Sequence, residues 1–133
     1  MLYENKSIIV RSGIFEENEN IFQKLKKECE IELKADSKAV DVDFLDIKTI
    51  VILFDSFADG RGFSIARQLR QFGYIGIIRA KGHLLADQYP LAIRCGFDEV
   101  EISSEHAKRQ PQHQWSDSFT RVKNNYQDRL MLA

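Results

Sequence analysis

One segment sets the architecture of this chain: IVILFDSFADGRGFS, residues 50–64. Residues 50–54 are a run of β-favouring apolar side chains bounded by turn formers, which predicts a buried strand. The strand leads into a loop in which Gly60 and Gly62 stand on either side of Arg61. The segment therefore places acids, a guanidinium and glycine backbone directly after a buried strand, an arrangement typical of a polar site in an α/β protein.

A helix is expected to follow this loop. It should begin at about Ser64, because a serine hydroxyl at the N-cap can accept a hydrogen bond from a free amide of the first turn. It should end near Phe72, because Gly73 can supply the left-handed residue that commonly follows a helix. Together with the strand before it, this helix makes one strand–loop–helix unit.

The following residues repeat the same pattern. Residues 77–80 predict a second strand, and residues 84–95 predict a second helix whose first half is irregular because of Pro90. Gly96 repeats the glycine signal of a helix end, and residues 97–102 predict a third strand. Strands that alternate with helices of this length predict a parallel β-α-β-α-β core.

The N-terminal part reads as a β-rich lead-in. Residues 7–10 predict a strand that turns back as a hairpin through residues 14–15. Apolar residues at helical spacing predict a short amphipathic helix over 21–29. Residues 31–33 alternate as an edge strand does, and the acidic stretch 36–46 is expected to contain one helical turn.

The C-terminal part changes character. Residues 103–114 are polar and include Pro111, which predicts a mobile loop. Apolar residues then recur at helical spacing over 115–126 and predict a final amphipathic helix that covers the sheet or a partner subunit.

The length of 133 residues suits one domain. We divide it into the lead-in 1–49, the β-α-β-α-β core 50–102, and the loop and C-terminal helix 103–133. The predicted class is α/β, with a core resembling part of a (β/α) barrel. Such a sheet leaves an edge exposed, so a homodimer through the N-terminal strands or the last helix is a further hypothesis.

Composition excludes several classes of protein. A formal net charge of −1 argues against a nucleic-acid binder, which is usually strongly basic. Neither a signal-peptide pattern nor an apolar run of membrane-spanning length occurs, so a cytoplasmic protein without a membrane partner is expected. Cys29 and Cys95 form no CxxC motif, which argues against a disulfide scaffold, a zinc site and a redox motif.

In a parallel sheet, ligands bind outside the carboxyl ends of the strands. This rule brings together the loops 55–64, 81–87 and 103–105. Their polar residues are the candidate site: Asp59, Arg61, Ser64, Lys81, His83 and Asp87, with Arg79 and Glu101 near the strand ends. Backbone amides after Gly60 and Gly62, helped by Arg61, would hold a small anion such as phosphate, sulfite or a carboxylate.

Other interpretations of these residues stay open. Arg61 can instead pair with Asp55 or Asp59 as a structural strut. Asp59, Asp87 or His83 can serve as a general base, which would make the site catalytic. The glycine pattern is neither a P-loop nor a dinucleotide fingerprint, and no metal or cofactor is expected.

Three motifs carry a resemblance to a known family. DGRGFS at 59–64, DQ at 87–88 and RCGFD at 94–98, at these spacings, resemble the signature of the bacterial family catalogued as domain of unknown function 934. The resemblance covers roughly residues 50–102, and it adds Gln88 to the candidate site. It implies a small cytoplasmic protein encoded alongside assimilatory sulfite reductase, in a family whose members are often labelled oxidoreductases.

Three functional hypotheses follow. The first is an accessory protein of sulfite reduction that holds a small anion or a partner loop, with sulfite reductase components as partners. The second is a small enzyme with a pocket at Asp59, Arg61 and Asp87. The third is an interaction module that docks through charge, because residues 16–59 hold twelve acids against six lysines, whereas residues 61–94 hold six basic residues and a single acid.

Overall fold

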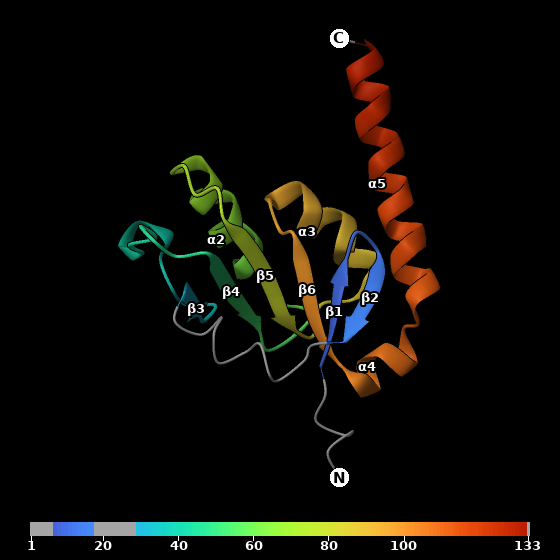
Figure 1. The fold of residues 1–133 in the computed structure, drawn as a ribbon, viewed down its shortest axis with the longest axis horizontal. Helices are drawn as coiled ribbons and strands as arrows, with labels where there is room; N and C mark the ends of the chain where they lie inside the picture. The colour runs from blue at the N-terminus through green and yellow to red at the C-terminus, as the bar shows by residue number, and fades with distance from the viewer. Residues whose placement is uncertain (1–6, 18–28, 133) are drawn as a thin grey trace.

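The structure is a computed structural model that describes residues 7–17 and 29–132, with side chains up to residue 122. Its centre is a six-stranded sheet with the order β2-β1-β6-β5-β4-β3 (Figure 1). The strands are β1 (Ser7–Arg11), β2 (Ile14–Glu17), β3 (Glu30–Leu33), β4 (Thr49–Phe54), β5 (Ile77–Gly82) and β6 (Glu99–Ser103). β2 and β3 follow one another among the described strands, yet they lie at opposite edges of the sheet.

The core is the parallel β-α-β-α-β unit that the sequence predicts. β4, β5 and β6 pair in parallel and are connected by α2 (Arg61–Gln71) and by α3 (Tyr89–Cys95), which follows the 3₁₀ turn η3 (Ala86–Gln88). The lead-in supplies both edges: β3 pairs with β4 in parallel, and the β1–β2 hairpin joins β6 in antiparallel. The sheet is open and mixed, and the expected likeness to part of a (β/α) barrel is not confirmed.

One face of the sheet is apolar and carries the helices. Val10, Val100, Ala80 and Ile52 lie in one row of paired residues across four strands, and all four are fully buried. The helices α2, α3 and α5 (Gln112–Leu132) pack on this face, and the second half of α5 extends beyond the other elements (Figure 1). Burying each large apolar side chain here contributes about 1.5–3 kcal/mol relative to leaving it in water.

The opposite face of the sheet carries charges. Arg79 of β5 is 7% exposed and lies between the carboxylates of Glu30, Glu99 and Glu101 at 3.2–3.3 Å. Charges taken out of water need such partners, because the cost of desolvating an unpaired ion is several kcal/mol. Alternation along each strand therefore gives this sheet one apolar and one ion-paired face.

The first helix of the core begins earlier than expected. α2 starts at Arg61, with Gly60 at the N-cap, so the prediction of Ser64 as the N-cap is wrong. The reason is local. The Asp59 carboxylate accepts a hydrogen bond from the Arg61 amide at 3.1 Å, so a side chain that precedes the helix satisfies a free amide of its first turn. The predicted end is confirmed, because Phe72 is the C-cap and Gly73 has a φ of 97°.

Residues 103–114 are not a loop, so that prediction is wrong. They contain α4 (Ser104–Arg109) and the start of α5, on either side of Pro111. Ser103 is the N-cap of α4, since its hydroxyl accepts from the amide of His106 at 3.1 Å. The segment is also fixed from α5, because the indole of Trp115 donates to the carbonyl of Gln110 at 2.9 Å.

The remaining elements follow the predictions more closely. η3 precedes α3, and Pro90 lies at the start of α3, which confirms the irregular first half of this helix. The single helical turn expected in the acidic stretch is the 3₁₀ turn η2 (Ala39–Asp41). The helix expected over 21–29 lies outside the described residues except for its last position. Among the helices that the structure describes, none combines the length and the apolar character needed to cross a membrane.

Candidate functional site

The loops after β4, β5 and β6 meet at the carboxyl end of the sheet, as the strand order predicts. The side-chain amide of Gln88, in η3 after β5, donates to the carbonyl of Phe57, in the loop after β4, at 2.7 Å. The amide of Ala86 donates to Oε1 of Gln110, which follows α4, at 3.0 Å. Two glutamine side chains thus connect the three loops through hydrogen bonds.

A cavity of about 370 Å³ lies at this junction, and we name it the carboxyl-end pocket. Its lining comes from all three loops and consists of Phe57, His83, Leu85, His106, Arg109 and Gln110. Two imidazoles, a guanidinium and an amide are its polar groups, and there is no carboxylate among these lining residues. The lining is therefore suited to an anion rather than to a cation.

The buried imidazole of this pocket has a defined orientation. His106 Nε2 lies 2.9 Å from Gln110 Oε1, and the same oxygen accepts from the Ala86 amide. Because a backbone amide needs an oxygen there, Gln110 presents its carbonyl, and His106 must be the donor through Nε2. Nδ1 of the neutral ring is then left as an acceptor, or as a second donor when the ring is protonated.

The other two polar groups of the pocket, His83 and Arg109, have no side-chain partner in the part of the chain that the structure describes. Neither the His83 imidazole nor the Arg109 guanidinium makes a hydrogen bond or an ion pair with any described residue. Both side chains are exposed. Among the residues that the structure describes, no group of three or more His, Cys, Asp or Glu side chains is arranged to hold a metal ion. The unpaired donors make this pocket the strongest candidate site at the carboxyl end.

The glycine loop, residues 59–62, has a different geometry. Arg61 donates from Nε and from a terminal nitrogen to the two carboxylate oxygens of Asp59, at 3.0 and 2.8 Å. These side-chain hydrogen bonds, with that of the Arg61 amide, lower the pKa of Asp59 to about 2. Arg61 thus makes the pairing expected of a structural strut, although its side chain is 63% exposed.

One of the two glycines of this loop is explained by packing. A Cβ on Gly62 would lie 2.5 Å from the ring of Phe54, so glycine lets the start of α2 approach β4 closely. Gly60 has no comparable restriction. Arg61 and Ser64 line a separate cavity of about 770 Å³, formed between α2 and residues 35–40.

The structure places the other predicted residues apart from one another. Asp87 is exposed in η3, next to Gln88. Arg79 lies on the ion-paired face of the sheet and not in the loops, and Lys81 on that face pairs with Glu32 and Glu101 at 3.4 and 3.6 Å. The loops therefore bring Gln88 and His83 to one junction and leave Arg79 within the sheet.

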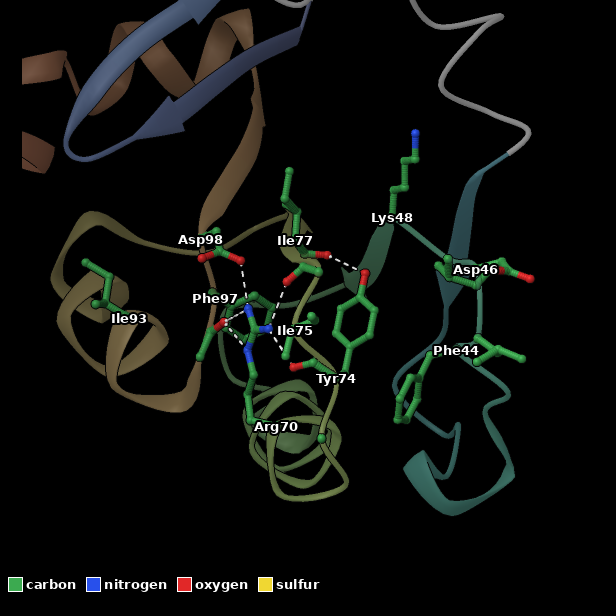
Figure 2. Close-up of a pocket in the computed structure, with 15 residues that line it drawn as sticks. Phe44, Asp46, Lys48, Arg70, Tyr74, Ile75, Ile77, Ile93, Phe97 and Asp98 are labelled. Atoms are coloured by element: carbon green, nitrogen blue, oxygen red, sulfur yellow. Dashed lines mark hydrogen bonds and ion pairs between the residues drawn. The ribbon is translucent and has the colours of Figure 1, made fainter.

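A larger cavity lies at the opposite, amino-terminal end of the strands, and we name it the amino-end groove (Figure 2). Its volume is about 990 Å³, and it is lined by residues 44–48, 73–77 and 96–98 together with Arg70 and Ile93. Arg70 is its central charge. Its guanidinium donates to the carbonyls of Tyr74, Gly76 and Gly96 at 2.8–3.1 Å and to Asp98 at 2.7 Å.

Sequence reasoning missed the apolar lining residues Phe57 and Leu85 and three polar residues of the carboxyl-end pocket. The polar ones are His106, Arg109 and Gln110. These three polar residues lie in the stretch expected to be a mobile loop, whereas they belong to α4 and its C-cap. One signal could have found them, because Ser103 directly after a strand is a favoured N-cap residue. A helix starting there brings the two side chains at 106 and 110 together, one turn apart.

The fold and the pocket define a class of protein: an open α/β domain with a small cationic cavity where three parallel strands end. A family model gives the particular family. Residues 29–131 match the family described as "Bacterial protein of unknown function (DUF934)", and the chain belongs to it. No curated protein and no solved structure matches the chain.

Proposed function

We propose that this protein binds a small anion in the carboxyl-end pocket and acts as an accessory protein of sulfite reduction. One observation carries the first part: His83 and Arg109 line the same cavity without a side-chain partner among the described residues, and none of its lining residues is a carboxylate. An arginine stays charged at every physiological pH, and its planar fork matches the oxygens of sulfite, sulfate or phosphate.

The position of the pocket supports the same proposal. Ligands of open parallel sheets bind outside the carboxyl ends of the strands, where loops from neighbouring strands supply separate contacts. Here Gln88 and Gln110 hold those loops together through hydrogen bonds within the protein. A pocket that is already formed spends less of its binding energy on ordering the protein.

The link with sulfite rests on the family resemblance. The motifs at 59–64, 87–88 and 94–98 resemble proteins encoded beside assimilatory sulfite reductase, and sulfite is an oxyanion of the kind that a guanidinium recognises. Components of sulfite reductase are then the proposed partners. The association would be sensitive to salt if the acidic residues 16–59 and the basic residues 61–94 take part in it.

The enzyme alternative is less favoured by the geometry. A general base near neutral pH works best with a pKa close to that pH. Asp59 is far from this condition, because the hydrogen bonds from Arg61 hold its pKa at about 2. Asp59 and Arg61 satisfy each other and make a poor catalytic pair.

Two arginine substitutions test the proposed location. Binding of sulfite, sulfate and phosphate would be measured by isothermal titration calorimetry for the unchanged protein, Arg109→Ala and Arg61→Ala. Both variants lose one exposed guanidinium near the carboxyl end, so their change in net charge is matched. We expect Arg109→Ala to weaken binding about tenfold or more, since a charged hydrogen bond contributes about 1.5–3 kcal/mol, while Arg61→Ala leaves binding unchanged.

The reverse result would assign the anion site to another part of the protein. If Arg61→Ala weakens binding and Arg109→Ala does not, the anion binds at the glycine loop, and the carboxyl-end pocket is not the site. His83→Ala provides a second check on the pocket, because it should also weaken binding while the stability to urea changes by less than about 0.5 kcal/mol. Absence of binding by all three anions would contradict the proposed function.

A further inference from the structure

The carboxyl-end pocket has an apolar wall that a bare oxyanion would not use. Phe57 and Leu85 line it together with the polar groups, and Phe57 is 56% exposed. Small-molecule pockets are typically lined by apolar and aromatic side chains together with a few polar groups. The lining therefore has two parts, an apolar part and a cationic part.

The backbone that carries Phe57 is held in place. Its carbonyl accepts from Gln88 at 2.7 Å, and the next amide, that of Ala58, donates to the hydroxyl of Ser56 at 3.1 Å. The hydrogen bonds thus hold the backbone of this loop, while the Phe57 ring stays outside the core, where Phe54 and Phe63 pack against each other. An exposed ring on a hydrogen-bonded loop is available to a ligand.

The size of the pocket points the same way. Its volume of about 370 Å³ lies within the range of small-molecule sites. A water molecule takes up roughly 30 Å³ in the liquid, and an inorganic oxyanion fills only a few such volumes. A bare anion would leave most of the pocket, including its apolar wall, filled with water.

We propose that the ligand of the carboxyl-end pocket is an organic phosphate or sulfonate with a flat apolar body. The anionic head lies against His83 and Arg109, and the apolar body lies against Phe57 and Leu85. Phosphate and sulfonate share the tetrahedral oxygens that a guanidinium recognises. This inference rests on the proposed function, because it takes anion binding at the same pocket as given.

Three probes separate the two parts of the lining: phenyl phosphate, inorganic phosphate and phenol. Their binding to the full chain would be compared by isothermal titration calorimetry, together with benzenesulfonate as the sulfonate arm. We expect phenyl phosphate to bind about tenfold more tightly than inorganic phosphate and phenol not to bind measurably. Contact of one ring with an aromatic side chain is sufficient for a difference of this size.

Phe57→Ala is the matching variant. It should reduce the affinity for phenyl phosphate to that for inorganic phosphate, while the affinity for inorganic phosphate is unchanged. Phe57→Leu serves as a second variant, since it keeps an apolar side chain and should show an intermediate loss. Because the Phe57 side chain is largely exposed, both variants are expected to fold, which a urea titration would check.

The outcomes distinguish this inference from the proposed function. If inorganic phosphate binds as tightly as phenyl phosphate, or if Phe57→Ala changes neither affinity, the organic ligand is excluded and anion binding stands. Equal binding of phenol and phenyl phosphate would also overturn the inference, because the charged head would then contribute nothing. If no anion binds, the proposed function itself fails.

Discussion

The two ends of the parallel strands each have a cavity with an arginine, and they use it in opposite ways. At the amino end, all five N–H donors of an arginine take part in the hydrogen bonds that Arg70 makes to three carbonyls and to Asp98 (Figure 2). At the carboxyl end, Arg109 has no partner among the described residues. The arginine of the larger cavity therefore uses its hydrogen-bond donors within the protein, whereas the arginine of the smaller cavity has donors available for a ligand.

This comparison shows that the volume of a cavity does not identify a binding site. A ligand gains affinity only from donors that the protein has not already used, since breaking an internal hydrogen bond costs about as much as the new one returns. The turn from Tyr74 to Gly76 points carbonyl groups inward, where no strand donates hydrogen bonds to them. The Arg70 guanidinium donates to these carbonyls instead. We therefore assign Arg70 to stability and Arg109 to recognition.

The largest expected effect is on stability, from Arg70→Lys. A lysine keeps the charge but has three donors in place of five, so carbonyls of Tyr74, Gly76 or Gly96 lose their partners. We expect a loss of about 2–3 kcal/mol in the free energy of unfolding, measured by urea titration. Arg109→Lys is the control and should change this free energy by less than about 0.5 kcal/mol.

The comparison would fail if the two variants behaved alike. Equal stability of Arg70→Lys and the unchanged protein would show that the hydrogen bonds of Arg70 are replaced by water. Weaker binding of phosphate in Arg70→Lys, measured where the protein is still folded, would place a binding site at the amino-end groove.

A second substitution sharpens the assignment of the carboxyl end without removing a hydrogen bond. In Gln110→Glu the new carboxylate can still accept from Ala86 and from His106, so the fold should be retained. It adds a negative charge beside the pocket, and at a few ångströms this repels an anion by more than 1 kcal/mol. We expect phosphate to bind at least about tenfold more weakly, by calorimetry, with an unchanged midpoint in urea.

Unchanged affinity in Gln110→Glu would contradict the pocket as the anion site, because no ligand within contact of Gln110 could ignore that charge. Gln110→Leu is a comparison variant that should change stability through lost hydrogen bonds and adds no charge. It leaves the Ala86 amide and the His106 ring without their shared acceptor, so we expect a loss of stability of about 1–2 kcal/mol.

Much of the fold could be predicted from local sequence. The apolar runs at 50–54 and 77–80, with Gly73 and Gly96 after the helices, specify strands and helix ends through short-range sterics alone. Both glycines adopt the expected positive φ, 97° and 109°. Parallel pairing then follows, because short strands connected by helices have few other arrangements.

The site could be predicted only in part, because it depends on contacts between distant residues. His83 was among the candidates from its place after a strand, whereas His106 and Arg109 need a six-residue helix that has little periodicity of its own. Gly62 looks like part of an anion loop in sequence, yet its neighbour is Phe54 of the preceding strand. Contacts of this kind join residues of different elements, and the local sequence around each residue does not predict them.

The smallest expected effect concerns Arg61, which gives the carboxyl end a satisfied arginine of its own. The Asp59 carboxylate that pairs with it has a pKa near 2, below the usual value of about 3.9. A lowered pKa in the folded state means that the ionised carboxylate stabilises the protein at pH above about 4, and that this contribution disappears as the pH falls toward 2. In Asp59→Asn the amide oxygen can still accept from the Arg61 backbone, so the substitution removes the charge and one of the two oxygens that accept from the guanidinium.

Unfolding in urea at pH 7, 4 and 2 would measure this contribution. We expect Asp59→Asn to be slightly less stable than the unchanged protein at pH 7, by a small amount because exposed ion pairs are screened by solvent. Most of this difference should be lost at pH 2. A difference that grows toward pH 2 would contradict the lowered pKa. If Asp59→Asn also strengthens phosphate binding, Arg61 without its carboxylate partner is a second anion contact. The difference between Arg61 and Arg109 is then only that a carboxylate lies beside the Arg61 guanidinium.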